Sequence, residues 1–186
     1  QKAAGLDIRM LLPLHGFVWR QDLGYILGKY DLWSRYEPEQ RGVVIAYASV
    51  YGGTENAANI LACRLREQGV QVEMFDTSVT PASYILAAAF RFSHVVLAAP
   101  TYNGGVFVTM ENLLHDLTAH GLKGRRAAYI ENGSWAPTSA RGMQKLLEPL
   151  NWETAADTVT LRSALRQGQQ EDLERMATQL AESVKA

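Results

Sequence analysis

Three short stretches of this chain combine small residues with hydroxyl and amide side chains. They run from Ser49 to Thr54, from Pro100 to Gly105 and from Asn132 to Ser139, and each follows an apolar run of strand length. Side chains of these types form hydrogen bonds without carrying charge. The three stretches are therefore the first candidates for a ligand-binding site.

The first stretch is expected to bind a phosphate group. It consists of Ser49, Val50, Tyr51, Gly52, Gly53 and Thr54, at the start of a helical pattern. The amino end of a helix offers unpaired N–H groups and a positive dipole end, and glycines let the backbone approach an anion closely. No Lys or Arg lies in this stretch, and the Gly-Lys-Ser/Thr and G-x-G-x-x-G patterns are absent. A phosphate monoester is therefore favoured over a triphosphate with magnesium. The alternative is an ordinary tight turn.

The second and third stretches add an aromatic side chain each. The second consists of Pro100, Thr101, Tyr102, Asn103, Gly104 and Gly105, and the third begins with Asn132, Gly133, Ser134 and Trp135. Tyr102 offers a plane for stacking, and a large aromatic residue such as Trp135 on a loop usually covers something. The alternatives are a glycine-rich turn with a surface tyrosine, and a tryptophan that packs against a neighbouring domain.

The elements that must position these stretches alternate regularly after Gly42. Apolar runs predict strands at 43–48, 70–75, 94–99, 126–131 and 155–161. Helical patterns lie at 54–68, 81–90, 107–118, 140–150 and 171–185. Such alternation predicts an α/β fold, a three-layer sandwich with a five-stranded parallel sheet in the order 2-1-3-4-5. Ligands bind beyond the carboxyl ends of such strands, so the three stretches should share one crevice.

The first forty residues have a different character. Asp7 to Leu14 predicts one short strand, and a helical pattern runs from Asp22, a candidate N-cap, to about Tyr36. One strand and one helix do not form a domain alone. We therefore expect this part to pack on the remaining core or on a second copy. Because the chain starts at Gln1 without Met, we also expect a piece of a longer protein.

Composition excludes several classes of function. The 186 residues carry a net charge of −1, so no basic surface favours nucleic acid. Only one cysteine, Cys63, is present, and no apolar run reaches the length of a membrane helix. We expect no disulfide framework, no membrane span and a cytoplasmic location.

Other reactive residues are assigned structural roles. Asp76, at the end of the second strand, is expected to form a turn or cap, and Cys63 to be a small buried hydrophobe. His94 begins a strand and has no partner in sequence. A receiver domain of the same topology needs acids where Ser49 and Pro100 stand, so that class is excluded.

The pattern Ser-x-Tyr-Gly-x-Thr at residues 49–54 resembles the FMN-phosphate loop of flavodoxins. The longer strings at 46–56, 100–105 and 131–138 are similar to the flavodoxin domain of the flavodiiron proteins, also called A-type flavoproteins. The resemblance implies that all three stretches bind FMN. It further implies that the Gly104–Gly105 peptide faces the flavin N5, and that Trp135 covers the other flavin face or the dimethylbenzene edge.

The front of the chain resembles the end of another domain in that family. Leu12 to Arg20 and Tyr30 to Trp33 are similar to the tail of its metallo-β-lactamase-like domain, where the matching histidine is the last ligand of a diiron centre. The resemblance makes His15 an iron ligand in the full-length protein only, since the other ligand motifs are missing here. It divides the chain into residues 1–40, this tail and a linker helix, and 41–186, the FMN domain.

The function implied by the resemblance is an electron relay in an oxidoreductase. FMN would take electrons from a rubredoxin-like protein or a reductase and pass them to a diiron site, in a homodimer, that reduces O2 to water or NO to N2O. The alternatives are a stand-alone flavodoxin-type carrier, an FMN-dependent quinone reductase and a cofactor-free interaction module. We expect Thr54→Ala and, more severely, Gly53→Val to weaken FMN binding.

Overall fold

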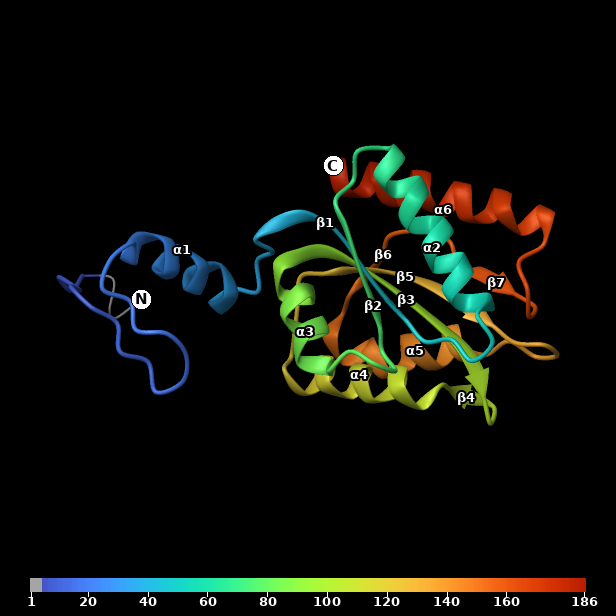
Figure 1. The fold of residues 1–186 in the computed structure, drawn as a ribbon, viewed down its shortest axis with the longest axis horizontal. Coiled ribbons are helices and arrows are strands. Elements are labelled where there is room, and N and C mark those ends of the chain that lie inside the picture. The colour runs from blue at the N-terminus through green and yellow to red at the C-terminus, as the bar shows by residue number, and fades with distance from the viewer. Residues whose placement is uncertain (1–4) are drawn as a thin grey trace.

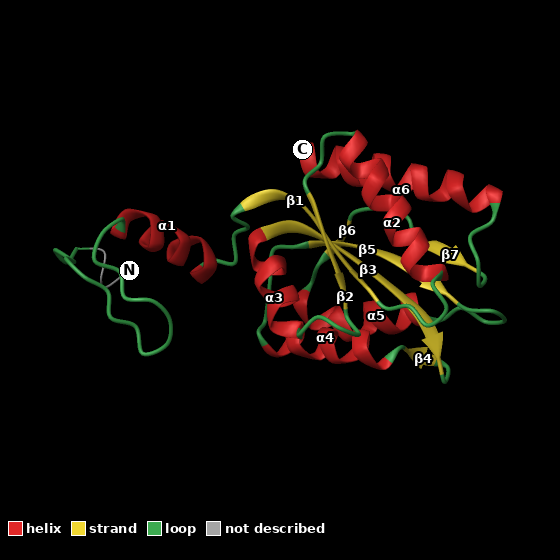
Figure 2. Ribbon diagram, in the orientation of Figure 1, coloured by secondary structure: helices red, strands yellow, loops and turns green. Residues whose placement is uncertain are grey.

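A computed structural model describes residues 5–186 of the chain. A twisted sheet forms its centre, and helices cover both faces (Figure 2). The strands are β1 (Gln40–Tyr47), β2 (Val72–Asp76), β3 (Phe92–Tyr102), β4 (Gly105–Val106), β5 (Arg126–Asn132), β6 (Glu153–Thr154) and β7 (Val159–Leu161). The helices are α1 (Leu23–Ser34), α2 (Gly53–Glu67), α3 (Ala82–Arg91), α4 (Val108–Ala119), α5 (Ser139–Leu147), the short 3-10 helix η1 (Glu148–Leu150) and α6 (Gln167–Lys185).

The strand order confirms the predicted sheet. Neighbouring strands are β2-β1-β3-β5, followed by β6 and β7, which both pair with β5, and all of these pairs are parallel. The expected fifth strand at 155–161 is replaced by these two short pieces, with Ala155 to Asp157 outside any strand. β4 is an addition that pairs antiparallel with the end of β3.

Two hydrophobic cores hold the three layers together. In β1, Val43 and Ile45 face α2 and α6, whereas Val44 and Ala46 face α3, α4 and α5. Successive side chains of a strand point to opposite faces, so one continuous apolar run serves both layers. Figure 1 shows these two helix layers above and below the sheet. Cys63, expected to be buried, is exposed, because it lies on the side of α2 that faces away from the core.

The front segment, residues 5–39, lies beside this three-layer body (Figure 1). The predicted strand at 7–14 is wrong: only the pair Leu11 and Trp19 forms a bridge, through two backbone hydrogen bonds. Asp22 occupies the N-cap position of α1, but its φ is +54° and its side chain makes no cap hydrogen bond. No residue of α1 is buried, so the single chain does not supply the packing that the apolar residues of this segment need.

Only the end of α1 is fastened to the body. Within the segment, Trp33 Nε1 donates to Glu39 at 2.6 Å and Lys29 pairs with the same carboxylate, just before β1 begins. Toward the body, the rings of Tyr36 and Phe90 lie 6.1 Å apart. The expected packing on the core is thus limited to this junction. Packing on a second copy stays a prediction.

A buried arginine anchors the junction. Arg125 is only 2% exposed, and its guanidinium donates to the carbonyls of Ala89, Phe90 and Tyr36, among others. Burial lowers the pKa of Arg125 to about 10, which still leaves it charged at neutral pH. The guanidinium therefore satisfies the last carbonyls of α3 and fixes the residues that follow α1.

Candidate functional site

A cavity of about 390 Å³ lies beyond the carboxyl ends of β1, β3 and β5. It is lined by Ser49, Val50, Tyr51, Gly53, Thr54, Pro100, Thr101, Tyr102, Asn132, Gly133, Ser134, Ser163 and Ala164. The parallel register brings the three predicted stretches together at this edge. The predicted residues outside the lining are Gly52, Asn103, Gly104, Gly105 and Trp135. Every side chain that lines the cavity is uncharged.

The amino end of α2 opens into this cavity. Gly52 precedes the helix with φ +81°, and its N–H donates to Ser49 Oγ at 3.1 Å. The next three amides, those of Gly53, Thr54 and Glu55, have no acceptor among residues 5–186. These N–H groups and the helix dipole favour an anion at this end without any cationic side chain. The Glu55 carboxylate of the same turn lies outside the cavity lining and accepts from the Tyr47 hydroxyl at 3.4 Å.

Gly53 is needed for packing rather than for open access to a ligand. A Cβ at this position would lie 2.4 Å from the carbonyl oxygen of Ser163 and 3.2 Å from Asn132 Nδ2. The sequence suggested that glycines are needed here so that an anion can approach the backbone closely. That reason fits Gly52, where a Cβ would meet no atom within 4 Å, better than Gly53. Ser163 and Ala164 follow β7, and sequence reasoning missed both because nothing local marks them as neighbours of α2.

The second stretch forms a β-hairpin in which Gly105 is part of a strand. Thr101 pairs with Val106 and Tyr102 with Gly105. Asn103 and Gly104 form the tip with φ of +49° and +73°, as a type I′ turn requires. Tyr102 lines the cavity, and its ring packs edge-on against Phe107 at a centroid distance of 5.5 Å.

The third stretch is tied to the second by hydrogen bonds. Thr101 Oγ1 accepts from the amides of Thr138 at 2.8 Å and Ser139 at 3.1 Å, which caps the amino end of α5. The Thr138 hydroxyl donates to the Gly104 carbonyl at 3.4 Å. Trp135 is 92% exposed and stands outside the cavity lining. Because the amino end of α5 is capped and that of α2 is not, α2 is the better anion site.

The front segment, which contains His15, lies at the opposite end of the molecule from β4 and the amino end of α2 (Figure 1). The side chain of His15 is exposed. Within the described residues, no three His, Cys, Asp or Glu side chains gather as metal ligands would. Among the same residues, no helix is both long and apolar enough to cross a membrane.

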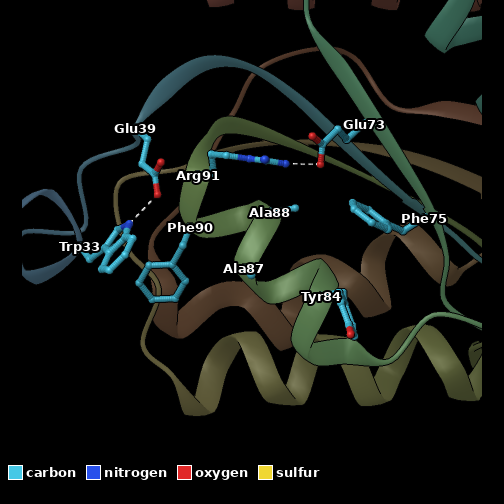
Figure 3. A pocket seen from close by; sticks show the side chains of 9 residues that line it. All are labelled: Trp33, Glu39, Glu73, Phe75, Tyr84, Ala87, Ala88, Phe90 and Arg91. Carbon is cyan, nitrogen blue, oxygen red and sulfur yellow. Dashed lines mark hydrogen bonds and ion pairs between the residues drawn. The ribbon is translucent and has the colours of Figure 1, made fainter. Parts of the chain in front are cut away.

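A larger cavity of about 540 Å³ lies along α3, between β2 and the end of α1 (Figure 3). Its charged groups are paired: Arg91 pairs with Glu73, and Glu39 accepts from Trp33, although Arg91 Nε is buried without a hydrogen-bond partner among the described residues. Its remaining walls are mostly aromatic and alanine side chains. Tyr84 provides the one hydroxyl in this lining, and no helix amino end with a run of unpaired amides opens here as it does at α2, so the cavity at α2 is the better candidate site.

Comparison with known proteins gives the class of the fold first. No family model matches the chain. A flavodoxin from Streptococcus pneumoniae TIGR4 superposes with a TM-score of 0.66 at 24% identity, over 76% of this chain and 98% of that one. The chain is therefore a flavodoxin-like α/β protein.

More particularly, relatives and structural neighbours along the chain are flavodiiron proteins. The nitric oxide reductase of Moorella thermoacetica is 29% identical over 143 residues, 77% of this chain and 35% of that protein. The rubredoxin oxygen:oxidoreductase of Desulfovibrio gigas superposes with a TM-score of 0.90 at 22% identity, and the flavodiiron protein of Giardia intestinalis with 0.87 at 21%. The resemblance to the flavodiiron family is thus confirmed. Each structural match covers 99% of this chain and 46% of the other, so the chain spans less than half of these relatives.

Proposed function

We propose that residues 41–186 form an FMN-binding electron-transfer domain. The observation that carries this proposal is the amino end of α2, where three unpaired amides meet an uncharged cavity rich in hydroxyl groups. Bound FMN would supply one- and two-electron redox chemistry, and the protein would supply position and environment.

The phosphate of FMN fits the first stretch. The amides of Gly53, Thr54 and Glu55 and the Thr54 hydroxyl would donate to its oxygens, with Gly52 leaving room for close approach. Neutral donors at a helix amino end suffice for a phosphate monoester. The cavity volume of about 390 Å³ is that of a cofactor site.

The ring of FMN fits beside the second stretch. Tyr102 is half exposed at the cavity and offers a face for stacking. Tyr51 and Trp135 are almost fully exposed on the neighbouring loops, a costly position for large aromatic side chains with nothing to cover. We assign both to the edge of the bound ring, together with the Asn103–Gly104 turn.

The relatives support a proposal for the function of a longer protein. We propose that residues 1–40 complete a metallo-β-lactamase-like domain in which His15 binds iron. The FMN domain would then relay electrons from a rubredoxin-like protein or a reductase to a diiron site that reduces O2 or NO, within a homodimer. The names of the relatives, a nitric oxide reductase and a rubredoxin oxygen:oxidoreductase, support this proposal.

A stand-alone flavodoxin-type carrier is the second candidate. The match to a flavodoxin over 98% of that protein favours it, while the exposed apolar residues of the front segment favour a larger assembly. Iron analysis of the full natural polypeptide separates the two: bound iron supports the flavodiiron function, and its absence after iron loading supports the carrier.

Titration of the flavin-free chain with FMN tests the binding site. We expect the fluorescence of FMN to be quenched when it binds. Riboflavin, which lacks the phosphate, should bind much more weakly. Thr54→Ala should weaken FMN binding by about 10- to 100-fold, as expected for a lost hydrogen bond to a charged group. Thr154→Ala, exposed on β6, is the matched control. Equal binding of FMN and riboflavin would show that this site does not bind the phosphate. If neither ligand binds, the proposed FMN-binding function is wrong.

A further inference from the structure

Asn132 links the end of β5 to two loops that are distant in sequence. Its side chain is 7% exposed. Nδ2 lies 3.2 Å from Thr54 Oγ1 and 2.9 Å from the Ser163 carbonyl, and Oδ1 lies 2.8 Å from the Ser163 amide nitrogen. One side chain thus joins the first turn of α2 to the loop that follows β7.

The two Ser163 contacts fix which way the amide of Asn132 points. A backbone N–H can only donate, so it must face Oδ1, and a backbone carbonyl can only accept, so it must face Nδ2. Nδ2 then has two hydrogens, and it donates one to the Ser163 carbonyl and the other to Thr54 Oγ1. Both donors of Asn132 are used inside the protein, so Asn132 has no hydrogen to offer a ligand.

The same geometry decides what the Thr54 hydroxyl can do. Its oxygen accepts from Asn132, so its hydrogen must point elsewhere, and no acceptor for it exists among residues 5–186. Thr54 is 2% exposed, and a buried donor without an acceptor is costly. The hydroxyl lies in the first turn of α2, beside the unpaired amides that face the cavity.

We propose that Asn132 is a positioning residue that, held by the Ser163 backbone, makes the Thr54 hydroxyl a donor to the phosphate of the bound ligand. The proposal rests on the proposed function and deepens it. It assigns specificity for a phosphorylated flavin to a residue that does not touch the phosphate. It also gives the loop after β7 a role in the site, through the contact that requires glycine at position 53.

A purely structural role for Asn132 would give a different result. If Asn132 only tied the loops together, its loss would weaken the binding of FMN and riboflavin alike. If it acts through Thr54, its loss should affect only the ligand that carries a phosphate. The ratio of the two dissociation constants therefore distinguishes the two roles.

The test measures this ratio in the intact chain for Asn132→Asp, Thr54→Val and the double variant. The aspartate can still accept from Ser163 N–H, but it cannot donate to the Ser163 carbonyl, a loss that should weaken both ligands alike. It also turns the Thr54 hydrogen toward itself. We expect each single variant to lower the preference for FMN over riboflavin by about 10- to 100-fold, the value of a hydrogen bond to a charged group. The aspartate also repels the phosphate, and that effect persists in the valine background. A smaller effect of Asn132→Asp in the valine background therefore supports the proposal.

Asn112→Asp, exposed on α4, makes the same chemical change away from the cavity and should leave the ratio unchanged. Strictly additive effects in the cycle would overturn the positioning role. If Asn132→Asp does not fold, Thr54→Val can still overturn the proposal, because an unchanged ratio there means that the hydroxyl does not reach the phosphate. Failure of the unmodified chain to bind FMN is a separate outcome, and it removes the proposed function itself.

Discussion

At the scale of single residues, the candidate site depends on a few atoms in close contact. Gly53 lacks a side chain and so lets the Ser163 carbonyl lie close to α2. Asn132 links the loop of Ser163 to Thr54 by hydrogen bonds, and Thr101 caps α5. These contacts join side chains from the ends of three strands and one later loop. Small changes at these residues should therefore have large effects on local packing.

Gly53→Val should destabilise the fold before any ligand is considered. Its Cβ would lie 2.4 Å from a backbone oxygen, so α2 and the loop after β7 must separate. We expect a loss of about 1–3 kcal/mol in the free energy of unfolding, the usual cost of overpacking, measured in urea without flavin. Gly168→Ala, with no atom within 4 Å of its Cβ, should not be destabilised. Equal stability of Gly53→Val and the unmodified chain would contradict the close approach.

At the scale of elements, the amino end of the sheet is joined to the last helix through a histidine. His94, on β3, is 3% exposed; Nδ1 lies 2.8 Å from Ser93 Oγ, and Nε2 lies 2.9 Å from Ser183 Oγ on α6. Burial first, and then the charges of Arg126 and Arg41, lower the pKa of His94 from 6.5 to about 4. The neutral ring is therefore the form that fits the fold.

This shift predicts that acid destabilises the protein. The unfolded chain binds a proton at His94 near pH 6.5, whereas the folded chain does so only near pH 4. Stability from this residue is thus complete above pH 6.5 and falls as the pH drops toward 4, by at most about 3 kcal/mol.

Urea unfolding at a series of pH values measures the effect of His94. His94→Gln should flatten the pH dependence between pH 4 and 6.5, while His115→Gln, exposed on α4, should leave it unchanged. The same slope in His94→Gln and in the unmodified chain would assign the acid sensitivity to other groups.

At the scale of the whole molecule, two parts are packed very differently. The sheet and its five covering helices contain both hydrophobic cores, whereas α1 buries no residue. In the front segment Leu12 is 68%, Leu14 97% and Phe17 84% exposed. Apolar side chains grouped at one end of a chain usually mark a surface that another polypeptide covers.

We expect the isolated chain to self-associate through its front segment. Sedimentation velocity over a wide concentration range should show association that a Leu14→Glu/Phe17→Glu double variant removes. Val79→Glu, 79% exposed after β2, is the control and should associate like the unmodified chain. A monomer at every concentration would show that these apolar residues do not suffice for association.

Local sequence patterns were enough to predict the main layers and their order. The strands β1, β3 and β5 were predicted because each is a continuous apolar run. The turn role of Asp76 is confirmed by its side chain, which accepts a hydrogen bond from the Ser78 amide at 2.7 Å. The predicted strand at 7–14 failed because an apolar run becomes a strand only where a partner strand is available. The prediction that Cys63 is buried was wrong because helical spacing alone does not determine where the buried face of a helix ends.

What the amino-acid sequence determined by itself was the fold class and the three loops that meet at one edge of the sheet, since strand ends and loop composition are local properties. Only the tertiary structure decided that Ser163 lies against Gly53, that Asn132 faces inward to Thr54, and that Gly105 pairs as a strand. These contacts join residues far apart in the chain or depend on the turn geometry. Their partners are chosen by packing, and no local pattern encodes that choice.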